Sequence, residues 1–263
     1  MLNLYQAVRA LECLLAISLL VQCFEFLRIQ HITQRDSVWD WQVQQVELAH
    51  SAGWVQNLFG FLYRDAVLHT HLIVRVVLAA SLFYGVSLVS SILLFASTLV
   101  ILIRWRGAFN GGSDFMTVVV LTGILIAQVA ALFVGPVLAW KAGLWYITIH
   151  TMSSYFLSGS VKLFSSEWRN GRALAYFLDG AVYGPLQADS IFRKKSVAIL
   201  CSWSFILWEC SFPLVLAGPE VAFAWCLCAA LFHFLVFWHF GLNRFFWAWL
   251  ASFPAIIYCS TQI

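Results

Sequence analysis

One lysine lies near the end of a predicted apolar helix at mid-chain, just before a polar turn, and its neighbours have the types and spacing to give it chemistry. This stretch of helix and turn runs from Tyr155 to Gly171. On a helix, Lys162 shares one face with Tyr155, Ser158 and Gly159, at spacings of three and four residues. The small residues on that face allow a second helix to come close. The lysine is then either a functional amine, whose neutral form accepts a proton, or an anchor that extends its ammonium to the membrane surface.

Two further charged residues fall near the centres of predicted apolar spans. Arg75 lies in the span expected over about residues 66–84, and Glu209 in the span over about residues 197–216. An isolated charge at such a depth costs about 2.5–3.5 kcal/mol on insertion scales. Because their depths match, we expect Arg75 and Glu209 to form an ion pair. That pair would either fix helix packing or serve as a proton or substrate site.

The histidines and cysteines do not form a recognisable metal motif. None of the seven histidines has a second histidine four residues away. Cys226 and Cys228 would face opposite sides of a helix, and we interpret the seven cysteines as small buried apolar residues. We therefore expect no metal site, although a haem held by histidines from different spans stays open. The sequence contains no phosphate-binding loop, nucleophile elbow or nucleic-acid motif.

The composition is that of a polytopic membrane protein. Hydrophobic residues make up 62% of the 263 residues, and charged residues only 10%. The net charge of +3 gives no indication of a nucleic-acid partner. The 13 tryptophans are typical either of interfacial belts or of a site that stacks a flat cofactor. The first apolar span is long and has no small-residue cleavage site, so we expect no cleavable signal peptide.

We predict an all-α bundle of about eight transmembrane helices, in a single domain over residues 1–263. The spans are expected over about residues 4–27, 66–84, 86–103, 115–138, 144–164, 197–216, 221–238 and 245–259. Residues 30–63 are too polar to span and are expected to lie at the membrane surface. Gly85 is expected to allow a tight turn, and Ser113 or Asp114 to cap the fourth span. Gly135-Pro136 should kink or end that helix, with Lys141 in the following loop.

Positive charges are divided unequally between the two sets of predicted loops. One set carries eleven lysines and arginines, whereas the other carries only Arg9 and Lys141. The positive-inside rule places the rich side in the cytoplasm and both chain termini outside it. We therefore expect a protein of the bacterial inner membrane, with membrane lipid as its first partner.

The central stretch resembles the membrane domain of the vitamin K-dependent γ-carboxylases and the related HTTM (horizontally transferred transmembrane) domain proteins. That motif has a tyrosine, a small residue, Lys-Leu, a polar turn, a tryptophan and a glycine. The matching residues here are Tyr155, Gly159, Lys162-Leu163, Trp168 and Gly171. A second, shorter match is the turn Asn110-Gly-Gly-Ser-Asp114, which is similar to the family's Asn-Gly-Asp turn.

The resemblance implies that Lys162 is the base that deprotonates a reduced quinone. On that basis we assign Lys162 and Tyr155 to a catalytic site, with a quinone or quinol as cofactor. We assign substrate binding to Trp168, Gly171, Asn110 and Asp114.

The chain departs from the family at two points. The carboxylases have a catalytic histidine near the turn that matches residues 110–114, where this chain has glycine or serine. His150 lies about 18 Å from Lys162 along the same predicted span, so it cannot contact that lysine. The family's large lumenal domain is also absent from these residues, so we do not expect glutamate carboxylation by this chain alone.

Two functions from different classes therefore stay open. The first is an enzyme that acts on a lipophilic quinone or a hydrophobic peptide, in the setting of secreted-peptide maturation that some bacterial relatives share. The second is a non-catalytic accessory or scaffold subunit of a larger membrane complex, which contacts other membrane subunits, a quinone or a pigment through its apolar, tryptophan-rich surface.

Overall fold

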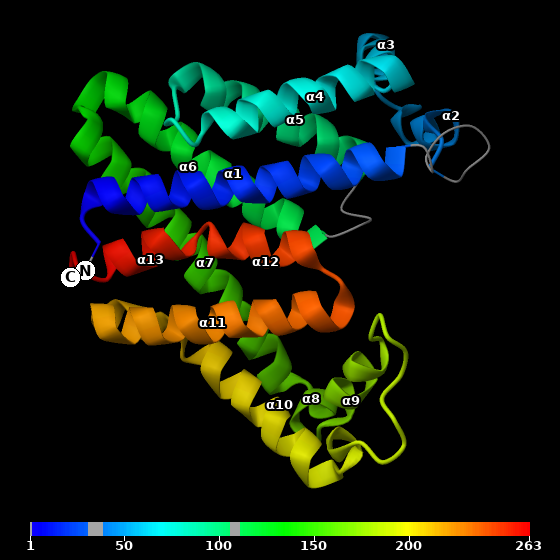
Figure 1. Ribbon diagram of the computed structural model, residues 1–263, viewed down its shortest axis with the longest axis vertical. Helices are drawn as coiled ribbons and strands as arrows, with labels where there is room; N and C mark the ends of the chain where they lie inside the picture. Colours follow the sequence, from blue (N-terminus) through cyan, green and yellow to red (C-terminus); the bar gives the residue numbers. More distant parts are fainter. Residues whose placement is uncertain (1, 31–38, 106–110) are drawn as a thin grey trace.

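The structure is a computed structural model, and it describes residues 2–30, 39–105 and 111–263. Over these residues the chain forms helices and their connections without a strand, so the all-α prediction is confirmed (Figure 1). The main helices are α1 (Leu4–Ile29), α4 (Asp65–Ser81), α5 (Leu88–Trp105), α6 (Gly111–Val134), α7 (Pro136–Phe164), α10 (Lys195–Cys210), α11 (Pro219–Phe240), α12 (Asn243–Leu250) and α13 (Phe253–Cys259). The shorter ones are α2 (Trp41–Gln44), η2 (Gln45–Leu48), α3 (Gly53–Leu62), α8 (Ser166–Arg169), α9 (Arg172–Asp179), η3 (Ile191–Arg193) and η4 (Phe212–Ala217).

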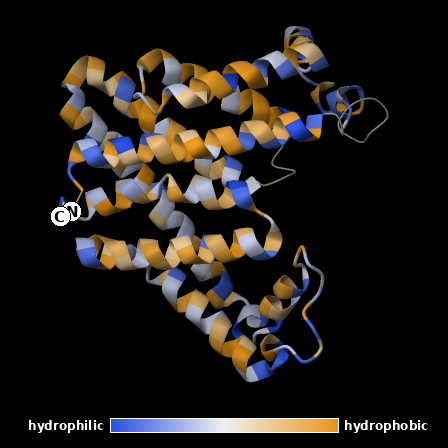
Figure 2. Cartoon of the chain, in the orientation of Figure 1, coloured by the Kyte–Doolittle hydropathy of each residue, from blue (hydrophilic) through white to orange (hydrophobic). Residues whose placement is uncertain are grey.

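Each of the predicted apolar spans overlaps one of the main helices, and the last overlaps α12 and α13 in succession. Among the described residues, four helices are long and apolar enough to cross a membrane by themselves: α1, α5, α6 and α11. Figure 2 shows that hydrophobic residues dominate these helices. The chain therefore has the character of a membrane protein.

A single residue separates α6 from α7. Gly135 has a φ of +80°, a left-handed conformation that glycine adopts without strain. Pro136 follows as the first residue of α7, where a missing N–H leaves no helical hydrogen bond unmade. The predicted break is confirmed, but the predicted loop around Lys141 is wrong, because Lys141 lies inside α7. Gly85, with a φ of +127°, forms part of the predicted turn between α4 and α5.

The centre of the bundle is the close contact between α6 and α7. A Cβ atom on Gly143 would lie 2.4 Å from the carbonyl oxygen of Gly123, so only glycine permits this approach. Apolar side chains of α1 pack against the same core, and they include Leu11, Leu15 and Leu19. On the other side, α7 packs against α10, so α7 links the core to the part of the molecule that contains α8 to α10.

The connections lie on two opposite sides of the bundle in Figure 1. The α3–α4 connection, the segment from α8 to η3 and the α11–α12 turn lie toward one side. The α4–α5 turn, the α6–α7 junction and η4 lie toward the other, where α1 begins and α13 ends. The first set carries most of the basic residues of the described connections, in agreement with the charge asymmetry read from the sequence.

Candidate functional site: a buried lysine–glutamate pair beside an apolar cavity

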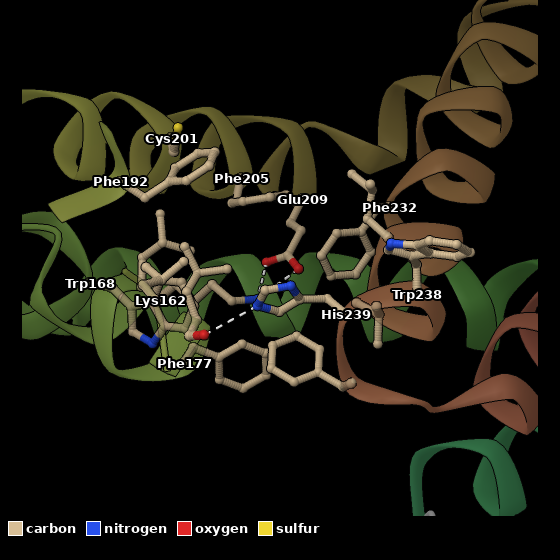
Figure 3. Close-up of a pocket in the computed structure, with 16 residues that line it drawn as sticks. Lys162, Trp168, Phe177, Phe192, Cys201, Phe205, Glu209, Phe232, Trp238 and His239 are labelled. Carbon is tan, nitrogen blue, oxygen red and sulfur yellow. Dashed lines mark hydrogen bonds and ion pairs between the residues drawn. The ribbon is translucent and has the colours of Figure 1, made fainter. Parts of the chain in front are cut away.

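Lys162 extends from α7 toward α10, where it forms an ion pair with Glu209. Its Nζ atom lies 2.5 Å from Oε2 and 2.7 Å from Oε1 of Glu209, and it also donates to Ser158 Oγ at 2.7 Å. The Lys162 side chain is 16% exposed and that of Glu209 only 4%. Figure 3 shows the two side chains meeting between the helices. The ammonium therefore points inward, and it does not act as a surface anchor.

Two glycines bring α10 close enough for this pair to form. A Cβ atom on Gly159, one turn before Lys162, would lie 2.6 Å from the backbone nitrogen of Cys210 and 2.8 Å from Glu209 Cβ. A Cβ atom on Gly171 would lie 2.8 Å from the carbonyl carbon of Ala198 near the other end of α10, and Gly171 has a φ of +78°. The prediction that small residues on the lysine face admit another helix is confirmed.

The pair lies on the wall of an apolar cavity with a volume of about 480 Å³. That volume is in the range of sites for small organic molecules. Aromatic rings from five elements line it, contributed by Trp168, Phe177, Phe192, Phe205, Phe232, Trp238 and Phe240. The Trp168 ring centroid lies 5.2 Å from Lys162 Nζ, within range of a cation–π contact. The predicted substrate-binding residue Trp168 therefore lies beside the predicted base.

Few polar groups face this cavity. Besides Lys162 and Glu209, the lining includes His239 and Cys201, and the His239 Nε2 atom lies 3.2 Å from the carbonyl oxygen of Leu178. Figure 3 shows His239 between Lys162 and Trp238 in that view. A ligand here would meet hydrophobic walls and one compensated pair of opposite charges.

Tyr155 occupies a separate, fully packed environment. Its hydroxyl lies 2.5 Å from His233 Nε2, and its ring stacks on Phe212 with centroids 4.0 Å apart. Trp208 and Trp249 contact the same ring edge-on. Tyr155 shares the lysine face of α7, as predicted, but it does not line the cavity. Its side chain therefore contributes to the core, about two helical turns from Lys162.

Replacing Tyr155 with phenylalanine should destabilise the protein by about 1–3 kcal/mol, because His233 Nε2 would lose its buried partner. The ring and its stacking would remain, so ligand binding in the cavity should be unchanged. Unfolding in mixed detergent micelles measures the first effect, and equilibrium binding of a lipophilic probe measures the second. A loss of binding without a loss of stability would instead mean that Tyr155 contributes to ligand binding.

The predicted ion pair between Arg75 and Glu209 is wrong. The Arg75 guanidinium donates to Ser97 Oγ at 2.8 Å, to Thr98 Oγ1 at 2.9 Å and to Gln22 Oε1 at 2.9 Å. It is fully buried in these contacts. The physical reason is the packing order: α4 lies against α1 and α5, whereas α10 lies against α7. Equal depth did not bring the two residues together.

Asp114 belongs to a second polar cluster, which lies away from the cavity. It lies inside the first turn of α6, so the predicted N-cap role of Ser113 or Asp114 is wrong. Asp114 Oδ1 accepts from Gln22 Nε2 at 2.9 Å and lies 3.3 Å from Arg244 Nη1. Gln22 thereby joins Arg75 to Asp114 across α1, α4 and α6. Asp114 does not line the cavity.

The other two predicted substrate-binding residues are Asn110 and Gly171. Asn110 lies outside the described residues, so the structure places only the Asp114 end of that turn. Gly171 acts through its backbone, since it forms the left-handed turn before α9 and contacts α10. Lys162, Trp168 and Gly171 are thus in one region, and Asp114 is in another.

The sequence analysis missed most of the cavity wall, including the face that α10 contributes. Cys201, Phe205 and Glu209 are four residues apart along α10, which places them on one helix face. That spacing could have predicted a shared helix face from the sequence. The charged residue Glu209 distinguishes this face from an ordinary apolar one. No comparable pattern marks Leu178, Leu186 or Phe192, which reach the cavity from the long connection between α7 and α10.

Within the described residues, no group of three or more histidine, cysteine, aspartate or glutamate side chains has a geometry that could hold a metal ion. Comparisons with protein-family models, with curated proteins and with solved structures found no match to this chain.

Proposed function

We propose that this chain is an integral membrane protein of the HTTM and γ-carboxylase-like type, with about eight membrane crossings. In this proposal α12 and α13 form the last crossing, and the described part of the predicted surface segment, residues 39–63, lies at the membrane surface. The basic side of the bundle faces the cytoplasm of a bacterial inner membrane, so both chain ends lie outside it. The resemblance of residues 155–171 supports the type of protein, and the charge distribution between the two sides supports the orientation.

We propose further that the cavity binds a lipophilic quinone or quinol. The observation that carries this proposal is the buried Lys162–Glu209 pair on the wall of an aromatic cavity. The pair has no net charge, so a charged ligand would introduce a buried charge without a partner, which is strongly unfavourable. A neutral ring with hydroxyl or carbonyl groups fits better, because aromatic side chains stack on it and the pair supplies a donor and an acceptor.

The pair can act as an acid–base device on a quinol. One hydroxyl of the quinol gives its proton to the Glu209 carboxylate, and the Lys162 ammonium stabilises the phenolate that forms. The alternative order begins with proton transfer from Lys162 to Glu209, after which the neutral amine takes the hydroxyl proton. Both routes end with glutamic acid, ammonium and phenolate. In this mechanism the base is the Lys162–Glu209 pair, whereas the sequence analysis assigned that role to Lys162 alone.

Substitutions that fill the cavity test the binding step. Cys201 lines the cavity, whereas Cys228 is exposed on α11. Cys201→Phe should weaken binding of a short-chain naphthoquinone by at least about tenfold, by steric occlusion. Cys228→Phe adds the same ring outside the cavity and should bind like the wild type. The measurement is equilibrium quenching of tryptophan fluorescence in detergent, and equal affinities in both variants would refute the cavity as the quinone site.

A non-catalytic role in a membrane complex is the second candidate. The observation in its favour is the outward face of α11, where Phe223, Leu227 and Leu231 are all more than half exposed. Such a face suits lipid, another membrane subunit or a secreted peptide. Purification in a mild detergent separates the two functions: a copurifying quinone supports the first, and a stoichiometric set of membrane subunits supports the second.

A further inference from the structure

The segment from Ser165 to Lys195, which connects α7 to α10, combines many cations with exposed apolar side chains. It contains five basic residues and three acidic ones: Arg169, Arg172, Arg193, Lys194 and Lys195, with Glu167, Asp179 and Asp189. Cations and apolar groups in one short segment are typical of structures that lie in the headgroup layer of a membrane. Its position between two main helices of the bundle makes that layer its natural environment.

The acidic residues neutralise only part of this charge. Asp179 pairs with Arg193 at 2.8 Å, with both side chains about one-third exposed, and Glu167 lies 3.8 Å from the well-exposed Arg172. The other three cations, Arg169, Lys194 and Lys195, are exposed, and within the described residues none has a carboxylate within ion-pair distance. The segment therefore keeps an excess of positive charge at its surface.

Contacts with α10 hold Arg169 and Arg172 toward the end of that helix where Lys194 and Lys195 lie. Trp203 Nε1 donates to the carbonyl oxygen of Arg169 at 3.2 Å, and Gly171 lies directly on Ala198. Arg169 and Arg172 are thus held along the first turns of α10, which begins at Lys195. The distance from Lys195 to Trp203 along the helix is about 12 Å. We call Arg169, Arg172, Lys194 and Lys195 the cationic patch.

Apolar side chains flank the cationic patch on the outside and the cavity on the inside. Tyr176 and Tyr183 are 78% and 77% exposed, and Ile191 is 57% exposed. Their neighbours Phe177 and Phe192 line the cavity instead. The segment thus forms the outer wall of the cavity, with its exposed rings placed to enter the boundary between headgroups and acyl chains.

We propose that the cationic patch is a binding site for the phosphate groups of anionic phospholipids. Each phosphate would accept hydrogen bonds from guanidinium and ammonium groups, while Tyr176, Tyr183 and Ile191 rest among the acyl chains. An acidic protein would satisfy the cations equally well, but it would leave these exposed apolar side chains in water. The proposal depends on membrane insertion and is independent of the quinone as a ligand.

Lipid titrations on the purified, delipidated full chain test this site. Dioctanoyl phosphatidylglycerol and dioctanoyl phosphatidylcholine are compared by native mass spectrometry, which counts bound lipids at each concentration. We expect wild-type protein to bind the anionic lipid at least about tenfold more tightly, since each cation near a headgroup adds to the attraction. Inorganic phosphate at the same concentration should not displace it, because phosphate lacks the acyl chains.

Variants connect the selectivity to the cationic patch. The combined variant Arg169→Gln, Arg172→Gln, Lys194→Gln and Lys195→Gln should lose most of the preference for phosphatidylglycerol. Lys141→Gln, a lysine of α7 toward the opposite side of the bundle, should keep it. Cys201→Phe should also keep it, so a failed quinone assignment leaves this result intact. Equal binding of the two lipids by wild type, an unchanged preference in the combined variant, or full displacement by phosphate overturns the proposal.

Discussion

Replacing Glu209 with leucine is expected to lower the free energy of unfolding by about 3 kcal/mol. The substitution leaves the Lys162 ammonium largely buried and without its carboxylate partner, and an uncompensated buried charge is costly. Ser158 Oγ alone would remain to accept its hydrogen bond. Unfolding in mixed micelles of dodecyl maltoside and sodium dodecyl sulfate measures the change.

The double variant Lys162→Met with Glu209→Leu is the matched control. It removes both charges and fills the space with apolar groups, so its stability should return to within about 1 kcal/mol of the wild type. The two single substitutions would then be strongly non-additive, which is the signature of a direct interaction. Additive effects, or a Glu209→Leu variant as stable as wild type, would contradict the pairing. The double variant also offers a folded protein without the acid–base pair, which any quinol chemistry should require.

Local sequence patterns predicted the features of the site that depend on one helix. The spacing of Tyr155, Gly159 and Lys162 placed all three on one face, and the structure has each of them facing the interior of the protein. The turn residues Gly85 and Gly135 were also recognised, because glycine at such positions reflects backbone geometry that is fixed locally.

Features that depend on which helices touch could not be predicted. Arg75 and Glu209 lie at similar depths in their spans, but depth along a helix does not determine its neighbours or the direction in which a side chain points. Lys162 was the nearer partner, and its identification required knowing that α7 and α10 are in contact. Asp114 illustrates the same limit, since its partners Gln22 and Arg244 come from distant parts of the chain.

Replacing Gly159 with alanine is expected to separate α10 from α7 and thereby to disrupt the site. The added Cβ would lie 2.6 Å from a backbone nitrogen and 2.8 Å from Glu209 Cβ, and a main-chain atom cannot move aside as a side chain can. Overpacking of this kind costs about 1–3 kcal/mol. Because the same displacement carries Glu209 away from Lys162, part of the ion-pair stabilisation should be lost as well.

Gly60 in α3 provides the control, because a Cβ atom there would have no neighbour within 4 Å. Gly60→Ala should be neutral or stabilising by up to about 1 kcal/mol, since alanine favours the helix more than glycine does. Both variants undergo the same chemical change, so a loss of stability confined to Gly159→Ala isolates the effect of helix approach.

Combining Gly159→Ala with the double variant Lys162→Met and Glu209→Leu then separates steric from electrostatic loss. If the ion pair contributes, Gly159→Ala should cost less in that background than in wild type. An equal cost in both backgrounds would mean that the lysine–glutamate pair tolerates the displacement, and that close approach of the helices serves packing alone.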